Sequence, residues 1–246
     1  SDGPVLVICP ASVRSMWCHE LDKWLQLNKQ DYQQSSSSSS SRFSSRPKIQ
    51  IKSISGQCDA WNDPSERLKH RSVTVTSYAM LKKLPEMAMD ESFHWNLVIL
   101  DEAHEHMVAG KTPRQGSLPH LLHHLISRNT NRALIVTGTP APTKILDAFS
   151  LVDALSNGSI LGSGSAEWRI RRARFMQHSC FSHLDSSGTG PIWNGNSHPE
   201  EIHTVLRASC MIRRTKEECV KDLPSITRSV LRLASEDLDR DFICFN

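Results

Sequence analysis

The sequence lacks the features that mark several large classes of protein. No apolar run approaches the roughly 20 residues that a helix needs to cross a bilayer. The first residues, Ser1 to Pro4, carry neither a basic start nor an apolar core, so we expect no secretory signal. The seven cysteines form no CxxC pair, which favours buried or unreactive thiols in a reducing compartment over a disulfide framework.

Neither positive nor negative charge predominates in the sequence. The 29 basic and 26 acidic residues give a net charge of +3, which is too small to indicate nucleic-acid binding by bulk charge alone. The length of 246 residues allows one large α/β domain or two small ones. Any interaction with nucleic acid therefore has to be argued from motifs.

A glycine-rich loop of the form G-x-x-x-x-G-K-[ST], which cradles nucleotide phosphates, is missing. Gly110-Lys111-Thr112 comes nearest, but it has no earlier glycine at the required spacing. The chain also begins without methionine. We therefore expect it to be a piece of a longer protein.

Buried strands and amphipathic helices alternate along the chain. Apolar or β-branched runs predict strands over residues 5–9, 49–54, 73–76, 95–100 and 133–136, the last of them buried. Helical spacing of apolar residues is found over 11–25, 78–84, 118–126, 145–155 and about 199–220. This alternation predicts an α/β fold with a mostly parallel sheet covered on both faces. The serine-rich stretch at about 31–47 is predicted to be a disordered insertion, and residues 157–199 a long, partly irregular excursion from the core.

Asp101 and Glu102 directly follow the strongest predicted strand, in the sequence Asp-Glu-Ala-His. Ligands of parallel sheets gather where strands end at their carboxyl edge. In nucleotide hydrolysis one carboxylate can hold Mg²⁺, usually through water, and a second can take the proton of the attacking water. Asp101 suits the first role and Glu102 the second. The alternative is an acidic turn that only caps a helix.

Thr137-Gly138-Thr139 forms a second polar turn after a predicted strand. Its hydroxyls are placed to bond His104 and so to connect a nucleotide site with a nucleic-acid surface. Gly138 would allow the backbone to approach another group closely. The alternative is a simple connection between strand and helix. No cysteine or carboxylate lies at the spacing of a structural zinc site from the histidines His104, His106, His120, His123 and His124.

Five segments, in the correct order, resemble motifs of the SNF2 family of DNA-stimulated ATPases. They are residues 5–13 with Trp17, Glu20, Lys23 and Trp24 (motif Ia), 75–81 (motif Ib), 100–104 (motif II, the DEAH box), 134–140 (motif III), and 211–216 with Leu223 and Pro224 (the arginine-rich closing helix). The resemblance implies a RecA-like three-layer sandwich with a helical C-terminal extension. Residues 1–156 would form the first RecA-like lobe, 157–230 a family-specific excursion and closing helix, and 231–246 the start of a linker toward a second lobe.

The resemblance also implies a function. Members of this family couple hydrolysis of ATP, with Mg²⁺, to movement along DNA in the nucleus. The segments 190–193 and 197–201, and the short spacing from motif III to Arg213-Arg214, are most similar to the annealing-helicase branch, which acts on forked DNA in repair. A chromatin-remodelling ATPase and a non-hydrolysing DNA-binding scaffold of the same fold are the alternatives.

Site residues follow from the same motifs. Ser12, Thr76 and Ser77 are predicted to contact the DNA backbone without reading its sequence. Asp101 and Glu102 would hold the Mg²⁺-bound nucleotide and act on water. In the family the phosphate-binding loop lies upstream of motif Ia and the second lobe downstream. We therefore expect this chain alone to bind ATP weakly and to be inactive.

Overall fold

The computed structural model describes residues 3–34, 49–56, 72–107, 113–161, 167–184, 190–193 and 195–219. The chain divides into two compact units, Ser1–Met211 and Ile212–Asn246. The predicted linker at 231–246 and most of the predicted insertion at 31–47 lie outside the described residues. None of the described helices is both long and apolar enough to cross a membrane.

Five parallel strands form one sheet in the order β2-β3-β1-β4-β5. The strands are β1 (Val5–Cys9), β2 (Gln50–Ser53), β3 (Ser72–Ser77), β4 (Leu97–Asp101) and β5 (Ala133–Val136). Val5 pairs with Val73 of β3 on one side and with Leu97 of β4 on the other. The predicted α/β class with a mostly parallel sheet is confirmed.

β1 lies at the centre because its residues are apolar on both faces. Leu6 and Ile8 are fully buried in the core on one side of the sheet, and Val7 and Cys9 in the core on the other side. A strand in this position has no face to expose to water, which is why its sequence reads as a continuous apolar run.

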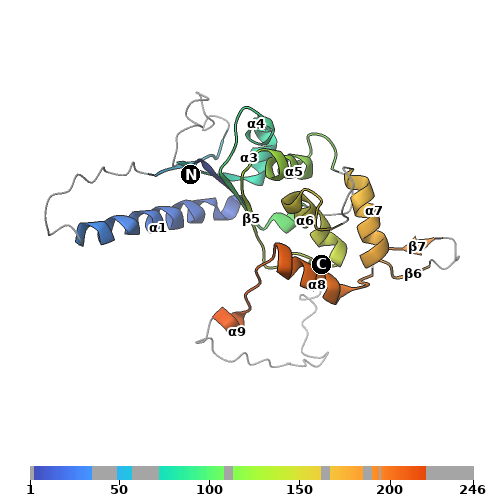
Figure 1. Cartoon of the computed structure of the whole chain (residues 1–246). Helices are drawn as coiled ribbons and strands as arrows, with labels where there is room; N and C mark the ends of the chain where they lie inside the picture. The colour runs from blue at the N-terminus through green and yellow to red at the C-terminus, as the bar shows by residue number, and fades with distance from the viewer. Residues whose placement is uncertain are drawn as a thin grey trace, which may run out of the picture. The chain divides into compact units, whose positions relative to one another are not determined.

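Helices cover the two faces of the sheet, as Figure 1 shows. One face carries the short helix η1 (Ala11–Val13) and α1 (Arg14–Gln34), with Trp17 and Leu21 packed on the strands. The other face carries α3 (Tyr78–Lys83), α4 (Glu86–Met89), α5 (Leu118–Arg128) and α6 (Phe149–Ser156), whose buried residues join the larger core. α1 continues to Gln34, four residues into the range of about 31–47 predicted for the insertion.

The prediction that β5 is a buried strand is wrong. It lies at the edge of the sheet, and Leu134 and Val136 are 50% and 41% exposed. Ala133 and Ile135 point the other way and pack against the larger core. α1 packs mainly on β2 and β3, so the described residues cover this apolar face of β5 only in part.

A second, smaller core joins α6 to η4 (Ile145–Ala148), α7 (Trp168–Ser179) and α8 (Pro199–Ser209). Phe149 is fully buried there, with its ring centroid 5.3 Å from that of Phe175. A two-stranded antiparallel hairpin, β6 (His183–Leu184) and β7 (Pro191–Ile192), lies between α7 and α8 along the chain. The excursion predicted to be partly irregular contains one regular helix of 12 residues, α7.

The sequence did not predict α7, because the buried face of this helix is not purely apolar. The helix carries four arginines, and one of them, Arg171, is 5% exposed. Its guanidinium donates from Nε to Oδ1 of Asp153 at 2.7 Å and from Nη2 to Oδ2 at 2.8 Å. Nε2 of His123 lies 3.1 Å from the same Oδ2. These three residues, from α5, α6 and α7, form a buried ion triad.

The single helix predicted over about 199–220 is two helices. α8 ends at Ser209, and α9 (Lys216–Cys219) begins after an irregular stretch that includes the exposed Arg213 and Arg214. Thr215 starts α9 with a capping box, because its N–H donates to the Glu218 carboxylate and its hydroxyl accepts from the Glu218 N–H. Such a box satisfies the free N–H groups of a helix start, which favours a new helix here.

Candidate functional site

Asp101, the last residue of β4, is held from both sides of the sheet. Nε1 of Trp17, on α1, donates to its Oδ2 at 2.8 Å. The Tyr78 hydroxyl, from the first turn of α3, donates to its main-chain oxygen at 2.7 Å. Burial and then the negative charge of Asp101 raise the pKa of Tyr78, so this hydroxyl keeps the proton that it donates. Oδ1 of Asp101 makes no hydrogen bond to another described residue.

Glu102 turns the chain sharply at the end of the strand. Its φ of 54° and ψ of 37° are left-handed, a conformation that costs a residue other than glycine about 1–2 kcal/mol. A hydrogen bond to the neighbouring strand stabilises this conformation: the Glu102 N–H donates to the main-chain oxygen of Val136 at 2.8 Å. The turn leaves the Glu102 side chain 42% exposed, next to Asp101 on the carboxyl edge of the sheet.

His104 connects the ends of β4 and β5. Its Nδ1 lies 3.1 Å from the Glu102 carboxylate and 2.7 Å from the Thr137 hydroxyl, and its Nε2 lies 3.2 Å from the Thr139 hydroxyl. An ionised carboxylate only accepts, so the contact with Glu102 requires the proton on Nδ1. Nε2 then accepts from Thr139. The predicted contacts of His104 with both threonines are present.

Gly138 does not make the close approach expected of it. A Cβ built there would meet open space among the described residues, and its φ is not left-handed. What the turn does supply is a fixed pair of hydroxyls, because the Thr139 N–H donates to Oγ1 of Thr137 at 3.1 Å.

The three residues predicted to contact DNA lie at the carboxyl ends of β1 and β3, which are neighbours in the sheet. Ser12, in η1, is exposed. Thr76 is fully buried and donates to the main-chain oxygen of Ile54, and Ser77 is 3% exposed and caps α3 by accepting the Met80 N–H. In this conformation a direct hydroxyl contact with a phosphate is open to Ser12 and closed to the other two residues.

Two aromatic residues of the site were not assigned a role from the sequence. Trp17 and Tyr78 both lie within motif segments, which was the available signal. Their convergence on Asp101 depends on the sheet order, and no local pattern reveals it. Cys9 is a further neighbour, where burial and then the charge of Asp101 raise the pKa of its thiol to about 11. This thiol is therefore protonated at neutral pH and unreactive.

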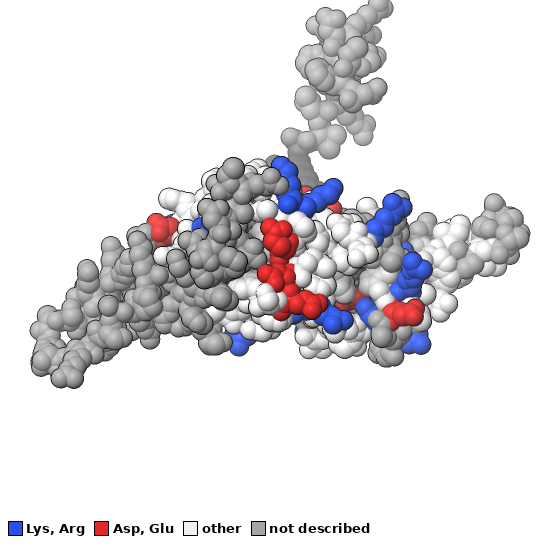
Figure 2. Space-filling model, turned by 90° about the horizontal axis from the view of Figure 1, so that it is seen from above, with Lys and Arg blue, Asp and Glu red and all other residues white. Residues whose placement is uncertain are grey.

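Charge is mixed on the face shown in Figure 2. Acidic side chains of the described residues gather near the middle of this view, and basic side chains lie around them. This mixture agrees with the small net charge of +3. Contact with a polyanion would rest on individual side chains and main-chain amides.

A parallel sheet between helical layers, with two carboxylates and a histidine at its carboxyl edge, defines an α/β domain of the RecA-like kind. The chain belongs to the SNF2-related domain family, whose family model matches residues 1–243. The family indicated by the five motifs is confirmed.

Several curated proteins are similar to the chain. The human DNA annealing helicase and endonuclease ZRANB3 is 26% identical over 232 residues, covering 92% of this chain and 18% of that protein. The Helicase SWR1 of Mycosarcoma maydis is 27% identical over 225 residues, with 91% of this chain and 11% of that protein covered. The SWI/SNF-related matrix-associated actin-dependent regulator of chromatin subfamily A-like protein 1 of Xenopus tropicalis is 23% identical over 241 residues, with 96% and 20% covered. The chain thus spans at most about a fifth of these relatives.

Proposed function

We propose that the chain is most of the first motor lobe of an ATP-dependent DNA translocase of the annealing-helicase kind, acting on duplex or forked DNA in the nucleus. One observation carries the proposal. Asp101 and Glu102 lie together at the carboxyl edge of the sheet, and His104 joins them to Thr137 and Thr139 at the end of the next strand. The similarity to a DNA annealing helicase over 92% of the chain supports the choice of DNA.

The residues present fit an Mg²⁺-bound nucleotide. Mg²⁺ takes oxygen ligands and keeps several waters, and Asp101 offers one carboxylate oxygen that is not hydrogen-bonded to a described residue. Asp101 would hold the ion through water. The bound Mg²⁺–ATP would supply a phosphoryl group open to attack by water. Glu102, whose side chain is 42% exposed, would take the proton of that water.

His104 would couple the state of the nucleotide site to the surface that contacts DNA. In the described conformation its Nδ1–H binds the Glu102 carboxylate and competes with water for that acceptor. A shift of Glu102 toward water would leave Nδ1–H to Thr137 alone, and Thr139 would follow because its N–H is bound to the Thr137 hydroxyl. The turn after β5 would thus move with the protonation of Glu102.

DNA would be held by its backbone, through Ser12 and the main-chain amides at the ends of β1 and β3. Contacts of this kind position a protein without reading sequence, and their strength falls with salt. The phosphate-gripping loop and a second RecA-like lobe would come from other parts of a longer protein. The chain alone would therefore bind ATP weakly and hydrolyse none.

The test is Glu102→Gln in the longer protein. We expect DNA-stimulated ATP turnover to fall by about 10²–10⁴-fold, as for removal of a general base, with DNA affinity unchanged. Glu105→Gln is the matched control, because Glu105 is exposed in the same turn and contacts neither Asp101 nor His104 through its side chain. Equal turnover in the wild type and Glu102→Gln would contradict the proposed role of Glu102. The absence of turnover in the wild-type longer protein would favour a non-hydrolysing scaffold.

A chromatin-remodelling ATPase is the second candidate, favoured by the likeness to a relative named as a regulator of chromatin. The two functions differ in the DNA that stimulates turnover. Stimulation by bare forked DNA beyond that by nucleosomes supports the annealing helicase, and the reverse order supports the remodeller.

A further inference from the structure

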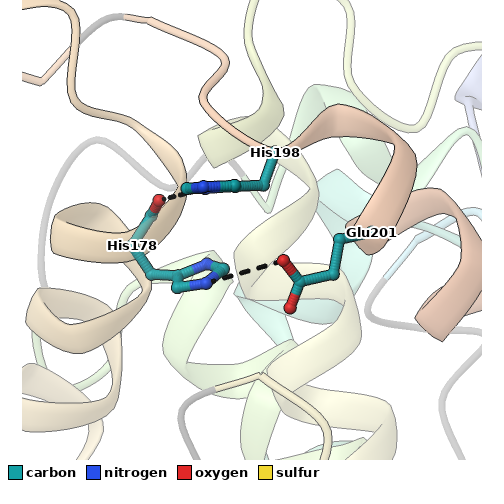
Figure 3. A group of neighbouring side chains, drawn as sticks. All are labelled: His178, His198 and Glu201. Carbon is teal, nitrogen blue, oxygen red and sulfur yellow. Dashed lines mark hydrogen bonds and ion pairs between the residues drawn. The ribbon is translucent and has the colours of Figure 1, made fainter.

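Three exposed side chains converge at the base of the β6–β7 hairpin, apart from the sheet edge that carries Asp101. His178 lies in the last turn of α7, His198 directly precedes α8, and Glu201 lies in the first turn of α8. One ligand atom from each lies within 4.8 Å of the others. Figure 3 shows the three side chains facing one another between the end of α7 and the start of α8.

Both histidines are oriented by a hydrogen bond at Nδ1, which leaves Nε2 as the atom that can bind a metal. Nδ1 of His198 lies 2.9 Å from the main-chain oxygen of His178, and because a carbonyl only accepts, this nitrogen carries the proton. The neutral ring then has its lone pair on Nε2. Nδ1 of His178 bonds the Ser179 hydroxyl at 3.1 Å, and its Nε2 faces the Glu201 carboxylate at 3.6 Å. Histidines that bind metals are oriented in this way by a bond from their second nitrogen.

The electrostatics favour a cation between these groups. The two rings stack with centroids 4.6 Å apart at an angle of 28°, a distance at which two protonated rings would repel. The Glu201 carboxylate adds a negative charge beside them. Its place in the first turn of a helix of 11 residues stabilises that charge.

The backbone brings His198 to His178 without help from an ion. The Ser197 N–H donates to the main-chain oxygen of Ser179 at 2.9 Å, and the Gly195 N–H to that of Cys180 at 3.0 Å. A Cβ at Gly195 would lie 2.5 Å from the main-chain oxygen of Phe181, so only glycine allows this closure. His198 itself has a φ of 113° and ψ of 52°, which is strained for a residue with a side chain. Strain of this kind is found where a side chain must be held in one place.

We propose that His178, His198 and Glu201 bind a zinc ion, which links the two ends of the segment between α7 and α8. Two imidazole nitrogens and one carboxylate oxygen suit zinc, which is commonly four-coordinate and leaves a position for water in such three-residue sites. Mg²⁺ is disfavoured because it takes oxygen ligands. A hollow of about 400 Å³ between α7 and α8, lined by His178, Glu201 and Arg174 among others, gives the fourth position access to water or a small anion. The site does not depend on the proposed motor function.

The experiment titrates zinc into the chelator-treated 246-residue chain and follows binding by calorimetry and thermal unfolding. We expect one ion per chain and a rise in melting temperature. His178→Ala, His198→Asn and Glu201→Gln should each weaken binding at least about tenfold and remove the rise. Asparagine is chosen at position 198 because it tolerates a positive φ. All three residues are exposed, so circular dichroism should show that the variants fold.

Matched controls come from the same helix. Glu200→Gln and His203→Ala alter an exposed carboxylate and an exposed imidazole outside the group, and both should bind zinc like the wild type. Cobalt provides an independent reading, because a site of nitrogen and oxygen ligands gives no thiolate charge-transfer band. Binding that survives Glu201→Gln and His178→Ala, a thiolate band with cobalt, or the absence of stoichiometric binding would overturn the proposal.

Discussion

The carboxylate of Asp101 receives its orientation from α1, on the face of the sheet opposite to α3. The indole N–H of Trp17 fixes one carboxylate oxygen, and the Tyr78 hydroxyl fixes the main chain of the same residue. A metal ligand that is already oriented loses less freedom when it binds. The residue proposed to hold Mg²⁺ is therefore tied to the helix that begins beside Ser12, the predicted DNA contact.

Trp17→Phe removes this N–H and keeps the aromatic ring. We expect a several-fold rise in the Mg²⁺ concentration that gives half-maximal ATP turnover in the longer protein, because a hydrogen bond to a charged group contributes about 1.5–3 kcal/mol. Maximal turnover at saturating Mg²⁺ should change less. Trp24→Phe is the control, since the Trp24 N–H also binds a carboxylate, that of Glu20, but on the exposed side of α1. An unchanged Mg²⁺ dependence in Trp17→Phe would show that the bond does not position Asp101.

Much of the site could be predicted at this scale. Asp101, Glu102 and Thr137 directly follow apolar strands, so their meeting at the carboxyl edge follows from parallel pairing. The roles of Trp17 and Tyr78 could not be predicted, because they depend on which strand lies beside which. His178, His198 and Glu201 were missed for another reason. Their spacing matches no metal motif, and only the closure of the hairpin base brings them together.

Among the helices, the buried ion triad is the strongest link between α5, α6 and α7. Asp153 has a fully buried side chain and accepts from Arg171 through both oxygens. Gly158 makes room for this contact, because a Cβ there would lie 2.3 Å from Nε of Arg171. A charged pair of this kind costs desolvation when it forms, but removal of one partner leaves an uncompensated buried charge.

Arg171→Met tests the triad. We expect the free energy of unfolding to fall by about 3–5 kcal/mol in chemical denaturation, because Asp153 remains buried without its main partner. Arg169→Met, on the exposed side of the same helix, should change it by about 0.5 kcal/mol or less. Similar values for the two variants would show that the pair contributes little to stability.

The pH dependence of the free energy of unfolding tests the same triad in a second way. Burial alone would raise the pKa of Asp153, but the hydrogen bonds and positive charge of Arg171, together with His123, outweigh it and hold the pKa below its usual value. A depressed acid pKa adds stability that is present above the unfolded pKa of about 3.9 and lost as pH falls through the folded value. Acid should therefore destabilise the wild type more steeply than Arg171→Met.

At the scale of the whole domain, the fold class followed from alternating strand and helix patterns, but the environment of each strand did not. The run Ala133–Val136 is as apolar as β1, yet it lies at the edge of the sheet. A short apolar run has the same appearance whether it is buried on both faces or on one. Only the sheet order shows that Leu134 and Val136 lie on an edge strand, where both side chains are partly exposed.

Leu134→Lys should reduce self-association of the chain without lowering its melting temperature. Exposed apolar side chains on an edge strand favour pairing between copies, and an edge lysine opposes it. Light scattering and thermal unfolding together measure the two effects. Ile135→Lys is the control from the opposite face of the same strand and should lower the melting temperature sharply, because Ile135 packs against the larger core. A wild-type level of self-association in Leu134→Lys would contradict the prediction.

The place of β1 in the sheet has a consequence for how the chain folds during synthesis. Val5 needs Val73 on one side and Leu97 on the other, whereas β2 meets β3 and β4 meets β5 after shorter separations. Contacts between residues far apart in sequence form slowly, because long loops must close first. The central strand therefore leaves the ribosome before β3 and β4, and its apolar side chains stay unpaired until those strands follow. In that interval the apolar side chains of Leu6, Val7 and Ile8 are open to chaperones.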